Sequence, residues 1–432
     1  MESVRLNPLD ELFLHLDHRE EPWVVHFEVR VGGRLDADRL AAALDAAAAQ
    51  HPIARARLAC WRDADTGYRW EIAETLDAPL TIVDCADEAE LVATRERLYG
   101  VSPSLAVAPP FIVVLARAEA GDSLMLNLHH AAGDGMGAAR LMLSILRAYA
   151  GADDPPPAVD PLRVRDVYAL AGASSPAQRL ERTRGAWRQA SDWLEGPPAR
   201  VALDGGADRP GYGFELLALS REETRVLSAR RTTDTTLNDV LLAGLALAIE
   251  RWNAEHHQPA QRIALTMPVN LRPAEWRTEV LANLVSYTTI SVGPGQCADL
   301  GSAIDAAGRQ TRLIKRDGLA GSVVDQLQRL SGLPIAIKRK LPDLIPLTGN
   351  VVVDTASLSN LGALDAFPSL GDEAGPVEAV WFSPPNRMPL GASFGVATMD
   401  GRLHLTLRYR YSQFDGEAAA AFARLYRETL LG

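Results

Sequence analysis

The stretch Leu124–Arg140, LMLNLHHAAGDGMGAAR, decides the fold of the chain. It opens with an apolar run of strand length, Leu124–Leu128, and this run ends at His129 and His130. Three glycines crowd the loop that follows, and from Met136 to Tyr149 the apolar spacing becomes helical. The pattern predicts a strand, a sharp turn and a helix, with two histidines held at the end of the strand.

This arrangement suits proton transfer. Histidine has an unperturbed pKa near physiological pH, so it can take up a proton and return it. A strand end fixes such a side chain better than a floppy loop does. The glycines, Gly133, Gly135 and Gly137, allow a close approach of backbone to a ligand and a positive φ. Asp134 can orient the loop by pairing with a cation elsewhere. The residues alone leave a catalytic base open beside the plainer interpretations, a polar pair on the surface or a satisfied polar group in the core.

The segment His129–Gly135, here called the histidine motif, matches the HHxxxDG signature of the chloramphenicol acetyltransferase-like superfamily. This superfamily includes condensation domains of nonribosomal peptide synthetases, polyketide-associated acyltransferases, alcohol acetyltransferases and wax ester synthases. Further stretches resemble family segments in the expected order: Asn7–Asp10, Thr236–Val240, Pro268–Pro273 followed by Asn283, and Ser359–Gly362. The chain therefore resembles this superfamily over nearly its whole length.

The resemblance implies an α/β fold of two chloramphenicol acetyltransferase-like lobes, which form a V-shaped pseudo-dimer with mixed sheets flanked by helices. A run of prolines, Pro155–Pro157, breaks the pattern near the end of the first lobe. We expect an N-terminal lobe over residues 1–175, which carries the histidine motif, and a C-terminal lobe over residues 176–432.

Periodicity predicts several elements of these lobes. The expected helices are Asp36–Gln50, Gln178–Leu194, Thr235–Trp252, Leu300–Arg316 and Gly416–Leu431. The expected strands are Val24–Val31, Phe111–Leu115, Ile263–Val269, Val285–Val292, Asn350–Asn360, Val377–Phe382, Ala392–Thr398 and Leu403–Arg410.

The resemblance also implies acyl transfer from a thioester on a phosphopantetheine arm, carried by coenzyme A or by an acyl or peptidyl carrier protein. The acceptor is a small-molecule alcohol or amine, and no bound cofactor or metal is expected. His130 is then the general base, and the backbone N–H of Gly135 helps to stabilise the tetrahedral oxyanion. The chain lacks a GxSxG nucleophile elbow, so direct transfer is simpler than an acyl-enzyme route.

Other residues receive supporting roles. His129 and Asp134 shape the loop, and Asp134 pairs with Arg272 because a buried carboxylate needs a cation or several hydrogen bonds. Ser359 and Asn360 are candidates for lining the substrate tunnel. The competing interpretation is a non-catalytic docking or scaffolding protein that keeps the fold, and the intact histidine motif argues against it. No adenylation or carrier segment adjoins these lobes, so we expect a free-standing enzyme.

Composition limits the remaining function classes. The 432 residues carry a net charge of -11, which argues against general nucleic-acid binding. Three separated cysteines suit a reducing cytoplasm. The longest apolar stretch, Val240–Ile249, is too short to span a bilayer, so no transmembrane segment is expected.

One basic segment stands out in this acidic chain. Lys338, Arg339 and Lys340 are consecutive, with Lys315 and Arg316 upstream. The segment is either a solvated helix end or an electrostatic dock for the donor, since coenzyme A and carrier proteins both bring negative charge.

Overall fold

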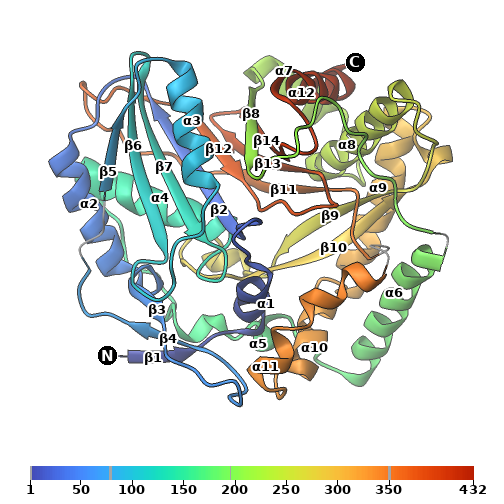
Figure 1. Cartoon of the computed structure of the whole chain (residues 1–432), viewed down its shortest axis with the longest axis horizontal. Helices are drawn as coiled ribbons and strands as arrows, with labels where there is room; N and C mark the ends of the chain where they lie inside the picture. Colours follow the sequence, from blue (N-terminus) through green and yellow to red (C-terminus); the bar gives the residue numbers. More distant parts are fainter. Residues whose placement is uncertain (1, 77–79, 195, 349–351) are drawn as a thin grey trace.

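The chain folds into two lobes, each built on a β-sheet flanked by helices (Figure 1). The computed structural model describes residues 2–76, 80–194, 196–348 and 352–432. This architecture confirms the predicted α/β fold class of two lobes with mixed sheets.

The sheet of the first lobe has the strand order β12-β2-β7-β6-β5. Its strands are β2 (Val24–Val31), β5 (Leu80–Asp84), β6 (Phe111–Ala118), β7 (Gly121–His129) and β12 (Val377–Ser383). Helices α2 (Ala37–Gln50) and α4 (Gly135–Ala150) share one core with this sheet, and α3 (Glu88–Tyr99) packs in a second. All nine residues of β7 are buried, which explains why its sequence is an apolar run without alternation.

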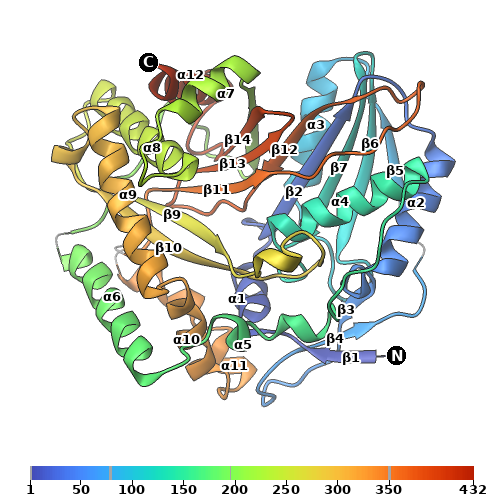
Figure 2. The ribbon, with the colours of Figure 1, turned by 180° about the vertical axis from the view of Figure 1, so that it is seen from behind.

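The sheet of the second lobe has the order β10-β9-β11-β13-β14-β8. Its strands are β8 (Tyr212–Ala218), β9 (Ile263–Asn270), β10 (Val285–Val292), β11 (Ala356–Ala363), β13 (Ala392–Met399) and β14 (Arg402–Arg410). Helices α8 (Leu237–Glu255), α9 (Leu300–Asp317) and α12 (Gly416–Leu431) pack against its core, with α7 (Arg221–Ala229) beside them (Figure 2). Of the expected strand Asn350–Asn360, residues 350–351 lie outside the described residues, and β11 begins at Ala356.

The remaining elements lie in the lower part of the molecule in Figure 1. A small sheet joins β1 (Glu2–Arg5), β3 (Ala56–Leu58) and β4 (Arg69–Ile72). The helices are α1 (Pro8–Leu16), α5 (Val167–Ala171), α6 (Pro176–Leu194), α10 (Gly321–Leu330) and α11 (Ile335–Lys338). Helix α1 lies centrally, between the two lobes.

Strand β12 departs from a simple division of the chain into halves. It comes late in the sequence, yet it pairs with β2 of the first lobe, where Phe382 lies opposite Phe27. It also packs against β13 and β14 of the second lobe. The division into residues 1–175 and 176–432 stays a prediction. Strand β12 belongs to the second of these ranges in sequence but to the sheet of the first lobe in space.

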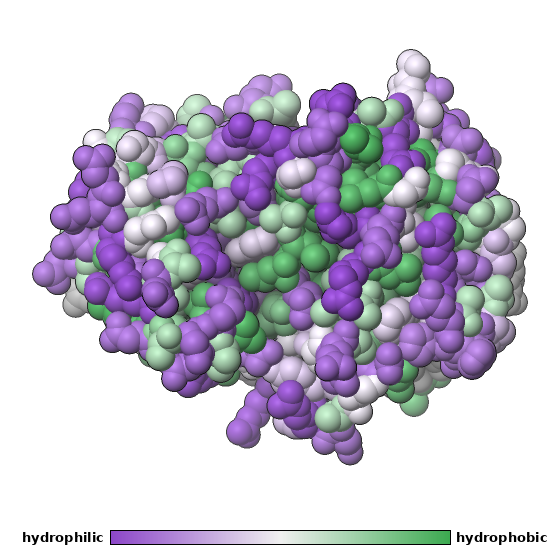
Figure 3. All heavy atoms as spheres, turned by 90° about the horizontal axis from the view of Figure 1, so that it is seen from above, coloured by the Kyte–Doolittle hydropathy of each residue, from purple (hydrophilic) through white to green (hydrophobic). Residues whose placement is uncertain are grey.

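Hydrophilic side chains predominate on the face of the molecule that Figure 3 shows. A hydrophobic area lies near the centre of this face. Within the ranges described above, no helix is long and apolar enough to cross a membrane.

Candidate active site

The histidine motif lies where a strand of the first lobe turns into a helix. His130 directly follows β7, and Asp134 is the N-cap of α4, whose Oδ1 accepts the N–H of Gly137 at 2.9 Å. The N-cap hydrogen bond satisfies one of the helix's free amides and fixes where the helix begins. The predicted order of strand, turn and helix is confirmed.

Asp134 also forms an ion pair with a guanidinium group of the second lobe. Arg272 donates from Nη1 to Asp134 Oδ2 at 2.7 Å and from Nη2 to Oδ1 at 3.0 Å. The backbone N–H of Leu284 adds a bond to Oδ2 at 2.7 Å. Both charged side chains are almost fully buried, with exposures of 3% for Asp134 and 0% for Arg272. The predicted ion pair is therefore present, and it joins the motif to the segment between β9 and β10.

The motif glycines serve close packing and not unusual backbone angles. None of Gly133, Gly135 and Gly137 has a positive φ, so this freedom of glycine is not used here. A Cβ on Gly135 would lie 2.7 Å from both Leu361 and Phe382, and one on Gly133 would lie 2.8 Å from Leu128. Since real Cβ atoms do not approach other atoms so closely, glycine lets the side chains of β11 and β12 reach the start of α4.

His130 is enclosed by apolar and aromatic groups. Its exposure is 7%, and its ring lies 4.0 Å, centroid to centroid, from that of Phe13 on α1. Burial lowers the pKa of His130 to about 4, although Asp134 acts in the opposite direction. The imidazole is therefore neutral at neutral pH and able to accept a proton.

His129 is held by neighbouring groups and does not face an open space. Its Nδ1 accepts the N–H of Ala131 at 3.1 Å, so the proton of the neutral ring is on Nε2. That nitrogen lies 3.6 Å from Oδ2 of Asp17. Asp17 is itself fixed by the N–H of Trp23 at 2.7 Å. These contacts fit the expected loop-shaping role of His129.

Two residues near the motif were not predicted from the sequence, Phe13 and Asp17. The signal for α1 was present, because Asn7 and Asp10 form a capping box and Pro8 occupies the first turn. Asn7 also donates from Nδ2 to the carbonyl of Asn283 at 3.1 Å, so two family-like segments meet here. No sequence pattern indicates that Phe13 covers His130.

The tunnel candidates lie on β11. Ser359 has an exposure of 8%, and Asn360 accepts the N–H of Gly362 on its Oδ1 at 2.8 Å. The next residue of the strand, Leu361, is the one that packs against Gly135. The structure thus places β11 beside the motif, and a contact of Ser359 or Asn360 with substrate stays a prediction.

The expected donor dock is wrong for Lys338. Its side chain is 6% exposed, forms an ion pair with Glu11 and donates to the carbonyl of Thr66 at 3.0 Å. Arg339 lies over the ring of Trp61, with 5.0 Å to the centroid. Arg339 and Lys340 are both exposed, and Lys340, whose side chain is 80% exposed, lies 3.8 Å from Asp343. The three basic residues therefore do not form one solvated patch.

The site does not resemble a metal centre. Among the residues that the structure describes, no group of three or more His, Cys, Asp or Glu side chains could hold a metal ion.

Comparison with known proteins places this geometry in a family. The Condensation domain model matches residues 12–318. Uncharacterized protein Rv2305 of Mycobacterium tuberculosis strain H37Rv is 40% identical over 435 residues, covering 100% of this chain and 99% of that protein. The corresponding protein of strain CDC 1551 shows the same identity and coverage.

Solved structures with low sequence identity share the fold. The first condensation domain of the calcium-dependent antibiotic synthetase superposes with a TM-score of 0.71 at 14% identity, covering 100% of this chain and 96% of that chain. The starter condensation domain of rhizomide synthetase gives 0.67 at 16% identity, covering 99% and 94%. The epimerization domain from the third module of tyrocidine synthetase B gives 0.65 at 18%, covering 100% and 96%. On the extent of the family match, the chain belongs to the condensation-domain family.

Proposed function

We propose that this protein transfers an acyl group from a phosphopantetheine thioester to a hydroxyl or amine, forming an ester or amide. The observation that carries this proposal is His130, a buried neutral imidazole at the end of β7, in a loop tied to both lobes. Family membership supports ester- or amide-forming transfer in general. The choice of acyl group and acceptor is open.

His130 acts as the general base in this proposal. It removes the proton of the acceptor hydroxyl or amine while the acceptor oxygen or nitrogen attacks the thioester carbonyl carbon. The resulting tetrahedral oxyanion collapses, the C–S bond breaks, and the imidazolium returns its proton to the departing thiolate. Burial favours this cycle, because a site closed to water protects the thioester from hydrolysis.

The start of α4 is the candidate for stabilising the oxyanion. Gly135 is the first residue of the helix, where backbone N–H groups have no partner within the helix. The side chain of Asp134 accepts Gly137 N–H, whereas no hydrogen bond of the described residues occupies Gly135 N–H. The positive end of the helix dipole adds to this effect.

The donor is proposed as coenzyme A or a carrier protein, with no group bound permanently. The rhizomide synthetase domain has a structure in complex with C8-CoA and Leu-SNAC, which makes C8-CoA a reasonable first donor to test. Arg339 and Lys340, the exposed residues of the run Lys338–Lys340, remain the candidates there for a donor contact.

The test is release of free thiol from acyl thioesters in the presence of alcohols or amines. His130→Ala should lower turnover about 10²–10⁴-fold, the usual share of general acid–base catalysis. His18→Ala, a change at an exposed histidine, is the matched control and should leave turnover unchanged. Near-normal turnover in His130→Ala would remove His130 as the base. No thiol release from any donor with the native chain would favour the scaffold interpretation.

A further inference from the structure

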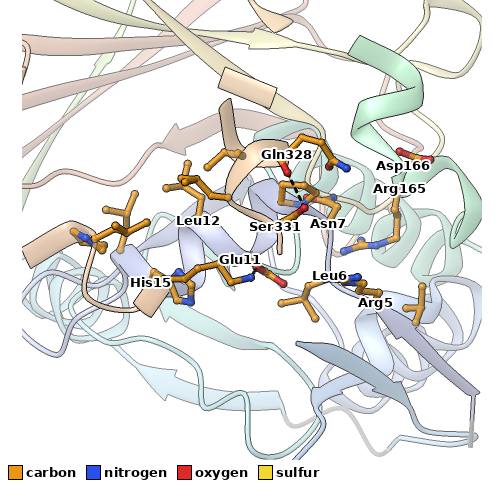
Figure 4. Close-up of a pocket in the computed structure, with 18 of the residues that line it drawn as sticks. Arg5, Leu6, Asn7, Glu11, Leu12, His15, Arg165, Asp166, Gln328 and Ser331 are labelled. Atoms are coloured by element: carbon orange, nitrogen blue, oxygen red, sulfur yellow. Dashed lines mark hydrogen bonds and ion pairs between the residues drawn. The ribbon is translucent and has the colours of Figure 1, made fainter. Parts of the chain in front are cut away.

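A cavity of about 560 Å³ lies on the side of α1 that faces the small sheet and α10, and the histidine motif is not part of its wall. Its walls come from both lobes, namely α1 and β1 on one side and α10 and residues 338–345 on the other (Figure 4). The volume falls in the range of about 300–1,000 Å³ that is typical of small-molecule sites. Of the family-like segments, Asn7–Asp10 contributes Asn7 and Pro8 to the wall.

The charged groups in the cavity wall already have partners. Glu11 pairs with Lys338, and Arg165 pairs with the buried Asp10. Asp166 accepts the N–H groups of Tyr168 and Ala169 at the start of α5. His15 contacts Tyr68 Oη at 3.2 Å from Nε2, and burial lowers its pKa to about 4, so it is neutral at neutral pH. The buried charged groups of the wall, Glu11, Lys338 and Arg165, are therefore all in ion pairs. Arg5, which donates to the carbonyl of Thr66, and Arg163, which lies beside Asp160, are exposed to solvent.

The rest of the wall is predominantly aliphatic. Leucines and isoleucines from four segments contribute: Leu6, Leu12, Leu16, Leu330, Leu341 and Ile345. The segment that supplies the last two also leaves aliphatic side chains in solvent. Ile337, Leu344 and Leu347 are 49%, 52% and 81% exposed. Clustered exposed apolar residues are unusual on a soluble protein and mark binding surfaces.

We propose that this cavity binds the unbranched aliphatic chain of a substrate and thereby sets its length. The inference rests on the proposed function, because that function makes the aliphatic chain part of a substrate. The chain is either the acyl group of the donor or the alkyl group of the acceptor. Helix α1 borders both regions: Leu12 and Leu16 line the cavity, and the ring of Phe13, which lies between them in sequence, packs on His130.

Binding of cis-parinaric acid, measured by its fluorescence, tests the cavity without requiring turnover. Competitors of increasing length, 1-alkanols in one series and acyl-coenzyme A thioesters in the other, should displace the probe. Affinity should rise roughly threefold to fourfold for each methylene that enters the cavity, then level off when the cavity is full. The series that shows this rise identifies which substrate supplies the chain.

Two substitutions fill the cavity from different elements. Leu330→Trp and Ile345→Trp should each weaken probe binding at least tenfold and shorten the chain length at which affinity levels off. Val107→Trp, at a residue that is 61% exposed and outside the cavity wall, is the matched control and should change neither. Circular dichroism and the melting temperature identify variants that keep the native fold.

Two results would overturn the proposal: affinity that does not depend on chain length in either series, or native probe binding in a folded Leu330→Trp or Ile345→Trp protein. His130→Ala should bind the probe as the native chain does. Chain binding without turnover would therefore contradict the proposed function and leave the cavity assignment standing.

Discussion

At the scale of single residues, Asp134 carries the largest structural role in the histidine motif. It caps α4 and accepts two bonds from Arg272 and one from Leu284 N–H. Asp134→Ala should reduce the free energy of unfolding by about 3–5 kcal/mol, because it leaves the fully buried guanidinium without a counter-ion. Activity should fall as well, since the loop that holds His130 loses its anchor. Urea denaturation and thiol release measure the two effects.

The control is a cap that lacks an ion pair. Asp87 caps α3 through Glu90 N–H at 2.9 Å, and Asp87→Ala should cost only about 1 kcal/mol. Asp134→Ala and Arg272→Ala, measured singly and together, give the coupling energy. Additive losses in that cycle would mean that the pair does not act as a unit.

The sequence predicts a side-chain contact correctly where motifs indicate both partners. It does not predict a contact whose partner lies in a distant segment without a motif. The Asp134–Arg272 pair followed from two strand-end motifs. Lys338 was placed in a solvated patch because its neighbours in sequence are basic. Its partner Glu11 is 327 residues away, and adjacency in sequence carries no information about such a contact.

At the scale of elements, β12 connects the two lobes. It pairs with β2, its Phe382 ring packs on Gly135, and the carbonyl of Phe382 lies over Gly395 of β13. A Cβ at Gly395 would be only 1.8 Å from that carbonyl oxygen. Gly395→Ala should therefore lower the free energy of unfolding by about 1–3 kcal/mol or more, the usual cost of overpacking. Activity should fall as well, because the added methyl group moves Phe382 away from the histidine motif.

Gly416→Ala is the matched control, because a Cβ there meets nothing within 4 Å and the residue opens α12. This change should be neutral or slightly stabilising. Thermal unfolding and thiol release, compared for the two variants, check the prediction. A Gly395→Ala protein with native stability would show that β12 can move away without cost.

Periodicity was sufficient to find most elements but not their partners. Gly416–Leu431 and Val24–Val31 were predicted with the bounds that the structure has, since each has a clear apolar pattern. Val377–Phe382 was recognised as a strand, but its place in the first sheet was not. The sequence of a strand indicates which of its faces are buried. It does not indicate which sheet the strand joins.

At the scale of the whole molecule, buried neutral histidines should make stability depend on pH. Burial lowers the pKa of His51 to about 3 and of His130 and His404 to about 4, and it holds that of His26 well below the usual 6.5. In the unfolded chain each of them takes up a proton as the pH falls through 6.5, whereas the folded chain does not. Each should therefore cost roughly 2 kcal/mol of stability between pH 7 and pH 5.

Carboxyl groups act in the opposite direction, because burial also raises the pKa of Asp354 and of Glu215. Burial raises the pKa of Asp10 to about 6 despite Arg165, so the folded chain binds this proton first and gains about 1 kcal/mol at pH 5. The four histidines outweigh these carboxyl groups, and the melting temperature should fall by about 5 °C or more between pH 7 and pH 5.

His404→Leu should flatten this dependence, because the ring packs edge-on against Trp381 and its nitrogens have no hydrogen-bond partner among the described residues. His18→Ala should leave the profile unchanged. A melting temperature that stays constant or rises on acidification would contradict this prediction, and it would weaken the argument that His130 is a neutral imidazole.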